Sequence, residues 1–177
     1  LNTKHGELAV GPARETAPGA DEIVVRNHAV AMNPVDWIIQ SLGDVMMPWL
    51  RYPFVLGTDV AGEVVSVGSA VRRFKVGDRV LGHAVGSDKQ RNRAAEGGFQ
   101  TRTLLLERMA APIPDSLTFE DASVLPLGLS TAACGLFQHD CLGLEQPSAF
   151  PEKSGKTVLI WGGSTSVGCN AIQLAVA

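Results

Sequence analysis

The sequence of 177 residues is long enough for one ordinary domain, or for one domain and part of another. With 45% apolar and 19% charged residues, its composition is that of a globular protein and excludes a disordered chain. The net charge of −3 provides no basic surface for nucleic acid or an anionic membrane, so we expect neither as a partner.

The first residues of the chain show neither an initiator Met nor a signal-peptide pattern, and no apolar stretch is long enough to span a bilayer. The three cysteines, Cys134, Cys141 and Cys169, form no C-x-x-C pair. Their odd number argues against a disulfide framework or a zinc knuckle. We therefore expect reduced, mostly buried thiols and a cytoplasmic location, with a truncation at both ends of the chain.

Short β-favouring runs separated by turn signals fill the chain up to about residue 110, which predicts a small β-barrel-like domain. Gly62, inside one of these runs, indicates a bulge or a close approach of two backbones. The expected strands span residues 22–32, 60–67, 79–85 and 99–106.

One short helix interrupts these strands. Asn33 is a good helix cap and Pro34 suits the first helical position, which predicts a helix over residues 35–42 that ends at Gly43. The segment that follows, residues 45–52, is rich in Met and Trp; it could form core or the wall of an apolar pocket, and core packing is the default. Arg91 and Arg93 belong to a polar loop, residues 86–98, that we expect to be solvated.

The apolar pattern changes beyond residue 115. Thr118 predicts the cap of a helix that Pro126 interrupts, and an apolar helix follows over residues 127–137. After a linker over residues 142–154, the apolar run 157–161 predicts a buried strand. A cluster of glycines and hydroxyls then leads into a helix expected over residues 167–177. This order of strand, turn and helix is typical of a nucleotide-binding unit, in which backbone N–H groups bind phosphate.

Six stretches together resemble the medium-chain dehydrogenase/reductase superfamily: residues 31–37, 56–65, 74–80, 97–100, 129–133 and the glycine turn, residues 162–168. Within it, the sequence is most similar to the fungal group related to quinone oxidoreductases and trans-acting enoyl reductases. Members of that group are often labelled zinc-binding dehydrogenase by domain name alone.

The resemblance implies a mixed α and β fold in which a GroES-like β-barrel domain is followed by the start of a Rossmann domain. The GroES-like, substrate-side domain is expected over residues 1–125, and a connecting helix and linker over residues 126–154. Residues 155–177 would supply the first strand, turn and partial helix of an incomplete NADP-binding domain. A full member is about twice as long, so we expect an N-terminal fragment that is inactive by itself and binds NADPH weakly or not at all.

The resemblance also bears on zinc. Zinc alcohol dehydrogenases of this superfamily bind a catalytic metal with Cys, His and an acidic residue, as the chemistry of zinc favours. Here Asn33 or its neighbour matches the position of the Cys ligand, and Gly57-Thr58-Asp59 replaces a Gly-His-Glu motif. No cysteine precedes Cys134, and an isolated His83 is more often a packed or surface residue than a ligand. We therefore predict no metal site.

The activity implied is hydride transfer from NADPH to an activated C=C bond of an enone or enoyl thioester, or to a quinone, without zinc. Two alternatives stay open: a zinc-type alcohol dehydrogenase, and a nucleotide-binding protein without turnover. The expected partner is a small-molecule substrate, and the full-length protein is expected to be a monomer or homodimer. The preference for NADP over NAD rests on the resemblance alone.

The cofactor-binding residues predicted are Gly162, Gly163, Ser164, Thr165, Ser166, Val167 and Gly168 of the glycine turn, with Asn33 and Thr131 near the nicotinamide. Against a G-x-G-x-x-G template, Thr165 replaces the middle glycine, and hydroxyls are expected to donate to phosphate instead. Asn33 could equally be a plain helix cap, and the hydroxyl of Thr131 could bond its own helix backbone. No catalytic proton donor is assigned, because the one tyrosine, Tyr52, is displaced from the family's position.

Overall fold

The computed structural model describes residues 1–148, 150 and 154–177, without the side chain of residue 44. The predicted linker over residues 142–154 therefore includes four positions, 149 and 151–153, that lie outside the described residues. The chain forms two compact units, Leu1–Pro126 and Leu127–Ala177. Each unit is described by itself.

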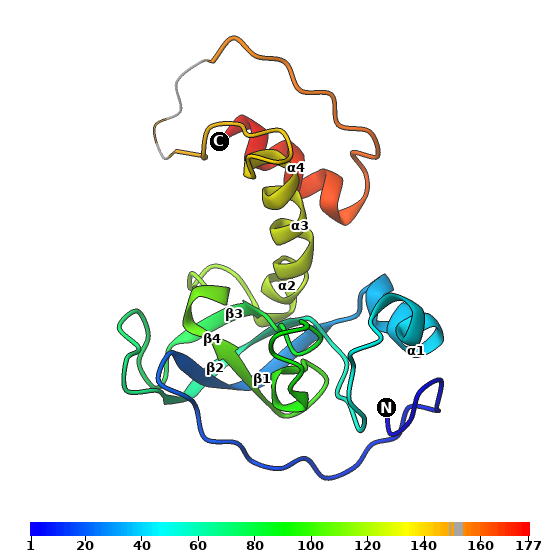
Figure 1. The fold of residues 1–177 in the computed structure, drawn as a ribbon. Helices are drawn as coiled ribbons and strands as arrows, with labels where there is room; N and C mark the ends of the chain where they lie inside the picture. Colours follow the sequence, from blue (N-terminus) through cyan, green and yellow to red (C-terminus); the bar gives the residue numbers. More distant parts are fainter. Residues whose placement is uncertain (149, 151–153) are drawn as a thin grey trace. The chain divides into compact units, whose positions relative to one another are not determined.

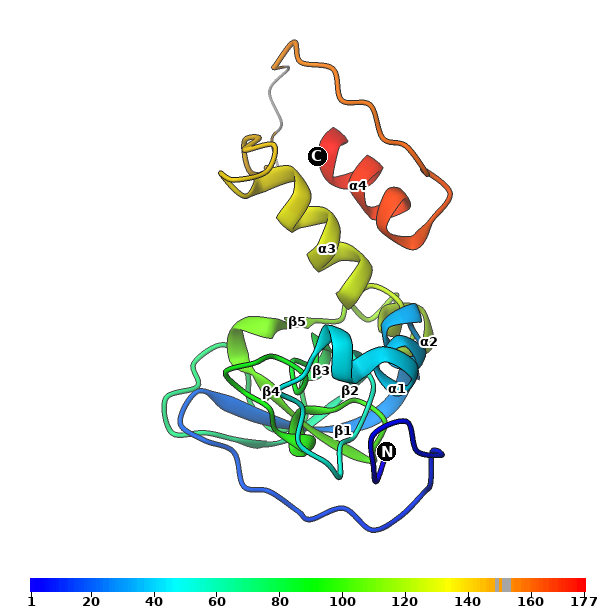
Figure 2. The same ribbon diagram turned by 45° about the vertical axis from the view of Figure 1, so that its right-hand side comes forward.

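The first unit is built on a curled sheet of five antiparallel strands in the order β4-β1-β2-β3-β5 (Figures 1 and 2). The four predicted strands are confirmed, with ends that differ by a few residues. The proline-containing segment after them pairs with β3 as a fifth strand. The strands are β1 (Glu22–Ala31), β2 (Asp59–Val67), β3 (Arg79–His83), β4 (Arg102–Leu106) and β5 (Ala110–Pro112).

The core of this unit lies on one face of the sheet. Alternate residues of a strand point to the same face, and here those residues are β-branched or Leu. Six of them, Ile23, Val25, Val60, Val64, Val80 and Leu105, are at most 1% exposed. The β-branched and Leu residues at these alternate positions thus form this core cluster, while β1, β2 and β4 also bury neighbouring residues on the other face.

Gly62 of β2 lies opposite Asn27 of β1 and confirms the predicted close approach of two backbones. A Cβ atom at Gly62 would stand 2.1 Å from the carbonyl oxygen of Arg26. Since ordinary contacts of such an atom are above 3.4 Å, only glycine fits here without moving β1 away from β2.

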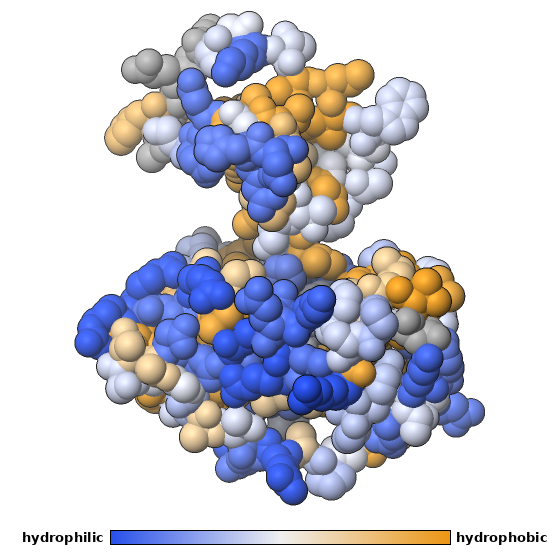
Figure 3. Space-filling view, in the orientation of Figure 1, coloured by the Kyte–Doolittle hydropathy of each residue, from blue (hydrophilic) through white to orange (hydrophobic). Residues whose placement is uncertain are grey.

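Helix α1 (Pro34–Met46) is longer than predicted, because Gly43 does not end it. Gly43 is buried, and a Cβ there would already lie 3.5 Å from the hydroxyl oxygen of Tyr52. The helix buries Ile39 in an apolar cluster with Leu1, Leu50, Phe54 and Leu56, and this packing extends it past the glycine. Its outer face exposes apolar side chains, visible as an orange group over α1 in Figure 3.

The remaining helices of the chain follow the sequence pattern. Two single 3₁₀ turns, η1 (Ala94–Glu96) and η2 (Glu107–Met109), flank β4. The Thr118 hydroxyl accepts a hydrogen bond of 3.1 Å from the backbone N–H of Asp121 and caps α2 (Phe119–Ser123), as predicted. Helix α3 (Pro126–Phe137) starts at Pro126, because proline suits a first helical position and ends the preceding helix.

The predicted strand at residues 157–161 is wrong: this segment of the second unit has no strand structure. Val158 and Ile160 pack against a small core of Ala132, Leu136 and Ala171, formed between α3 and α4 (Ser166–Val176). Their neighbours Leu159 and Trp161 are 87% and 95% exposed. The physical reason is that a strand needs a paired neighbour, and the described residues of this unit supply none.

The cysteine prediction is half right. Cys134, Cys141 and Cys169 are free thiols, but all three are exposed and not buried. Among the described helices, none combines the length and the apolar character needed to cross a membrane.

Candidate functional site

The glycine turn begins at a position whose backbone conformation favours glycine. Gly162 has a backbone φ of +80°, in the left-handed region. Its carbonyl oxygen accepts hydrogen bonds from the Thr165 backbone N–H at 2.9 Å and from the Thr165 hydroxyl at 2.8 Å. Thr165 is also the cap of α4, since its hydroxyl accepts from the Gly168 N–H at 3.0 Å. The residue that replaces the middle glycine of the template therefore closes the turn.

Gly168 makes the turn compact. A Cβ atom there would stand 2.2 Å from the Gly162 carbonyl oxygen and 2.8 Å from the Gly163 Cα. Around this contact Ser164, Thr165 and Ser166 are exposed at the start of α4. The exposed N-terminus of an 11-residue helix carries unpaired N–H groups and a partial positive charge, which suit an anion such as a phosphate.

Two further predicted cofactor residues lie elsewhere. Thr131 is exposed on α3, in the same unit as the turn, and its role stays a prediction. Asn33 lies in the first unit, where it precedes α1.

Asn33 is the N-cap residue of α1, in a capping box with Asp36, and its side chain also reaches beyond the helix. Its amide Nδ2 donates to the Thr58 hydroxyl at 3.1 Å and to Asp59 Oδ2 at 3.0 Å, at the start of β2. Asp36 supplies the other half of the capping box, because its carboxylate accepts from the Asn33 N–H at 2.8 Å, and it accepts from the Gly57 N–H at 3.0 Å as well. Burial raises the pKa of Asp36, and these two N–H bonds only partly oppose the shift.

Asn33, Thr58 and Asp59 thus form one hydrogen-bonded cluster, which we call the Asn33 cluster. Thr58 and Asp59 are 7% and 1% exposed. His83, at the end of β3, lies opposite Asp59 in the strand register, and burial lowers its pKa. Within the part of the chain that the structure describes, no group of three or more His, Cys, Asp or Glu side chains is arranged to hold a metal ion.

An open pocket of about 430 Å³ lies in the first unit next to His83. Met47 and Trp49 form one side, residues 83–85 the strand end, and residues 87–89 the other side. Both alternatives weighed for the segment 45–52 therefore hold: Met47 and Trp49 pack against the core and also line a pocket.

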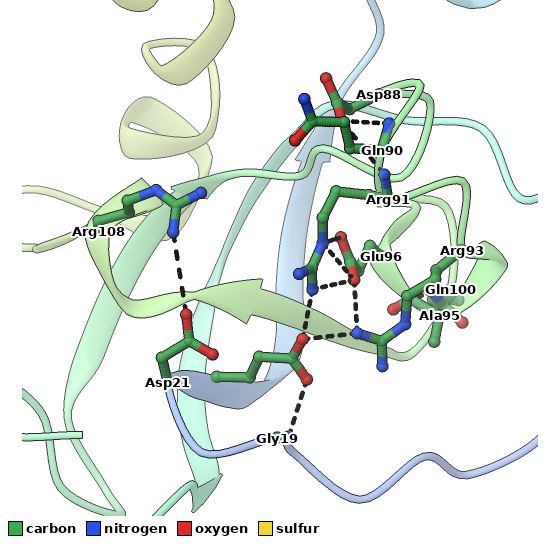
Figure 4. A network of polar contacts seen from close by, with 11 residues as sticks. Gly19, Asp21, Asp88, Gln90, Arg91, Arg93, Ala95, Glu96, Gln100 and Arg108 are labelled. Carbon is green, nitrogen blue, oxygen red and sulfur yellow. Dashed lines mark hydrogen bonds and ion pairs between the residues drawn. The ribbon is translucent and has the colours of Figure 1, made fainter. Parts of the chain in front are cut away.

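The expectation of a solvated loop around Arg91 and Arg93 is wrong. Both guanidinium groups pair with two buried carboxylates, Glu22 at the start of β1 and Glu96 in η1, in what we call the arginine network. Figure 4 shows Arg91 and Arg93 converging on Glu96, and Gly19 beside the network. Arg93 Nη1 lies 2.6 Å from Glu22 Oε1 and 2.9 Å from Glu96 Oε1, and Arg91 Nη2 lies 2.5 Å from Glu96 Oε1.

The arginines and glutamates of the network stabilise one another's charged forms. Glu96 and Glu22 raise the pKa of Arg91 above its usual range, although partial burial opposes them. Burial alone would raise the pKa of Glu22, but the Gly19 N–H, Arg93 and Arg91 together hold it below its ordinary value of 4.5. The network joins the loop of residues 86–98 to β1, and the loop forms one side of the pocket.

We expect this network to appear in the acid limb of the stability curve. The pKa of Glu22 is lower in the folded chain than its ordinary 4.5, so ionised Glu22 stabilises the fold above that pH. This contribution is lost as the pH falls below 4.5 toward the folded-state pKa. Asp36, with a raised pKa, acts in the opposite direction, so the difference between wild type and Glu22→Gln isolates Glu22.

Urea unfolding between neutral and acid pH measures this difference. The difference in unfolding free energy between wild type and Glu22→Gln should be largest near neutral pH. It should shrink as the pH falls below 4.5, where Glu22 becomes protonated. Glu7→Gln, in the exposed N-terminal segment, is the matched control and should leave the curve unchanged. A wild-type–to–Glu22→Gln difference that stays constant with pH would contradict the role of Glu22.

Sequence reasoning missed the arginine network. The available signal was the charge pattern: Glu22 starts an apolar strand, and Glu96 directly precedes Gly97 and Gly98. Buried carboxylates need cationic partners, and the arginines of the polar loop are near Glu96 in sequence. The other half of the network was concealed because Glu22 and Arg91 are 69 positions apart in the sequence.

Residues 19–115 match the protein family described as alcohol dehydrogenase GroES-like domain, which is more than half of the chain. The chain therefore belongs to this family, within the medium-chain dehydrogenase/reductase superfamily. The predicted fold class, with a GroES-like domain first, is confirmed.

Individual proteins add detail. Dehydrogenase pigH of Monascus ruber is 61% identical over 172 residues, which cover 96% of this chain and 46% of that protein. Trans-enoyl reductase himH of Aspergillus japonicus is 47% identical over 170 residues, which cover 96% of this chain and 48% of that protein. The crystal structure of Escherichia coli quinone oxidoreductase complexed with NADPH is 28% identical with a TM-score of 0.62, over 80% of this chain and 39% of that chain. The chain spans about half the length of the curated relatives it matches.

Proposed function

We propose that the full-length protein transfers a hydride from NADPH to an activated C=C bond or a quinone, without zinc. The observation that carries the zinc-independent part is the Asn33 cluster. In zinc dehydrogenases of the superfamily, the corresponding positions supply Cys and His ligands. Here the side chains at these positions are hydrogen-bonded to one another.

The donor set of the cluster does not suit zinc. Zinc in proteins prefers thiolate and imidazole ligands in a tetrahedral arrangement. The Asn33 amide nitrogen is a hydrogen-bond donor and has no lone pair for a metal, and Thr58 offers only a hydroxyl. Asp59 is the single carboxylate of the three, and it already accepts from Asn33 at 3.0 Å.

The glycine turn supports binding of NADPH. Its compact backbone and the exposed N-terminus of α4 fit a pyrophosphate, and residues 162–168 would hold it. When bound, the nicotinamide would supply the hydride. Nδ2 of Asn33 donates to Thr58 and Asp59, and the side chain also takes part in the capping box with Asp36, so a carboxamide N–H of the cofactor would share the Oδ1 acceptor with the start of α1.

The names of two relatives agree with this chemistry. One is a trans-enoyl reductase, and one solved neighbour is a quinone oxidoreductase complexed with NADPH. Reduction of an activated C=C bond places negative charge on a carbonyl oxygen, which hydrogen-bond donors can stabilise without a Lewis acid. The alkoxide of an alcohol oxidation needs more help of the kind that a metal provides.

We expect the full-length protein to oxidise NADPH with at least one of cyclohexenone, a crotonyl thioester and a benzoquinone, and 1,10-phenanthroline should leave the rate unchanged. Asn33→Ala should lower kcat/KM by about tenfold, equivalent to about 1.4 kcal/mol of lost positioning. Asn2→Ala, at an exposed position, is the control. Stoichiometric zinc together with inhibition by the chelator would favour the alcohol dehydrogenase instead. NADPH binding without turnover of any acceptor would favour the nucleotide-binding protein.

A further inference from the structure

The pocket beside β3 lies entirely within the first unit and has the size of a small-molecule site. Its volume of about 430 Å³ is within the range of about 300–1,000 Å³ that ligand pockets occupy. One side is apolar and polarisable, formed by Met47 and Trp49, and the rest combines Ala84 and Val85 with the polar residues His83, Ser87, Asp88 and Lys89. An aromatic wall beside a small number of polar groups is typical of sites that orient a small molecule.

Trp49 is held in place as a wall of this pocket. Its indole Nε1 donates to the Ser87 carbonyl oxygen at 2.9 Å, across the pocket's loop side. Its own carbonyl oxygen accepts from Asn92 Nδ2 at 2.5 Å. Asn92 also accepts from the Arg51 N–H at 3.2 Å, so one side chain bonds the peptide groups on both sides of Leu50. The indole is therefore positioned by its edge, while its ring lines the pocket.

Different polar residues lie at the two ends of the pocket. His83 forms the inner end, and it lies opposite Asp59 of the Asn33 cluster in the strand register. Lys89 is exposed at the outer side, with its ammonium nitrogen 6.0 Å from the centroid of the Trp49 ring. A ligand that spans the pocket thus meets His83 at one end, an aromatic wall at Trp49, and the oppositely charged Asp88 and Lys89 at the rim.

We propose that this pocket binds the flat, conjugated body of an unsaturated carbonyl substrate against Trp49 and Met47, with the carbonyl end toward His83. The inference rests on the proposed function, because it names the substrate class of that activity. Stacking on an aromatic face adds about 0.5–1.5 kcal/mol beyond burial of the same area. Methionine sulfur makes a similar contact with aromatic rings. A saturated ring of equal size gains neither the stacking on Trp49 nor the contact with the Met47 sulfur.

Binding to the 177-residue chain tests the proposal without NADPH. The sequence has three tryptophans, and Trp37 and Trp161 are 59% and 95% exposed, so Trp37→Phe with Trp161→Phe leaves Trp49 as the single reporter. We expect saturable quenching of Trp49 fluorescence by the cinnamoyl thioester of N-acetylcysteamine. The 3-cyclohexylacryloyl thioester, which has a saturated ring of similar size, should bind about tenfold more weakly.

A second measurement removes the wall itself. Calorimetry on the otherwise unchanged chain should show that Trp49→Leu weakens binding of the cinnamoyl thioester about tenfold. Trp37→Leu, on the exposed face of α1, should leave it unchanged. Equal affinities for the two thioesters, or equal affinities of wild type and Trp49→Leu, would overturn the proposal.

Turnover separates this inference from the function on which it rests. If the full-length protein reduces the cinnamoyl thioester equally well with and without Trp49→Leu, the pocket assignment is wrong and the reductase stands. If the chain binds the thioester as expected but the full-length protein oxidises no NADPH with any acceptor, the pocket is supported and the proposed function is wrong.

Discussion

Replacing Arg91 with Met should lower the free energy of unfolding of the first unit by about 3 kcal/mol. The substitution keeps most of the side-chain volume but leaves Glu22 and Glu96, which are 3% and 1% exposed, with only Arg93 as a cationic partner. Breaking a buried ion pair costs about 3–5 kcal/mol, because the remaining charge stays desolvated. Arg91 is itself 27% exposed, which places the expected value at the low end.

Arg108→Met is the matched control. Arg108 and Asp21, also drawn in Figure 4, form an ion pair of 3.9 Å whose side chains are 70% and 61% exposed. Exposed pairs of this kind contribute about 0–1 kcal/mol. Urea unfolding followed by the fluorescence of Trp49, with Trp37 and Trp161 replaced by Phe, compares both variants with the parent. Equal destabilisation by the two substitutions would show that the arginine network has no special role.

The second large effect is expected at the glycine turn: Gly168→Ala should weaken NADPH binding by the full-length protein about tenfold or more, or about 1.4 kcal/mol. The added Cβ would lie 2.2 Å from the Gly162 carbonyl oxygen, so the Gly162 backbone must retreat by about an ångström to restore an ordinary contact. That movement opens the turn whose backbone would face the pyrophosphate. Titration of NADPH fluorescence measures the change.

Gly135→Ala provides the control for this substitution. Gly135 lies in α3, and a Cβ atom there meets no atom within 4 Å, so NADPH affinity should be unchanged. Thr165→Val is a second test that adds no clash and removes only the hydroxyl joining Gly162 to Gly168. If both Gly168→Ala and Thr165→Val fold and bind NADPH like wild type, the turn is not the cofactor site.

Local patterns in the sequence were enough to predict most elements of the fold. Short β-favouring runs such as 22–32 predicted the strands, Thr118 and Pro126 predicted the ends of helices, and Gly62 predicted the close contact of β1 and β2. These features depend on a residue and its immediate neighbours. Gly43 misled because its propensity to end a helix is weak compared with the burial of Ile39 by the same helix.

Elements that depend on distant partners could not be predicted in this way. The run 157–161 has the composition of a buried strand, but strand pairing is a property of two segments and the composition of one cannot supply it. The Asn33 side chain could be matched to a family position, whereas its bonds to Thr58 and Asp59 depend on α1 and β2 meeting in space. The same holds for Glu22 and Arg91, which no local pattern connects.

The loop of residues 86–98 divides into a fixed base and a replaceable tip, and this has a consequence for engineering. Its base is closed by the backbone bonds between Gly86 and Glu96 and between Arg93 and Gly86, and it is anchored by the arginine network and Asn92. Asp88, Lys89 and Gln90 at the tip are exposed. Lys89 and Gln90 can therefore be randomised in a library, changing what the pocket rim presents to a substrate, while Asp88 is kept because its Oδ1 accepts from the Gln90 and Arg91 N–H groups.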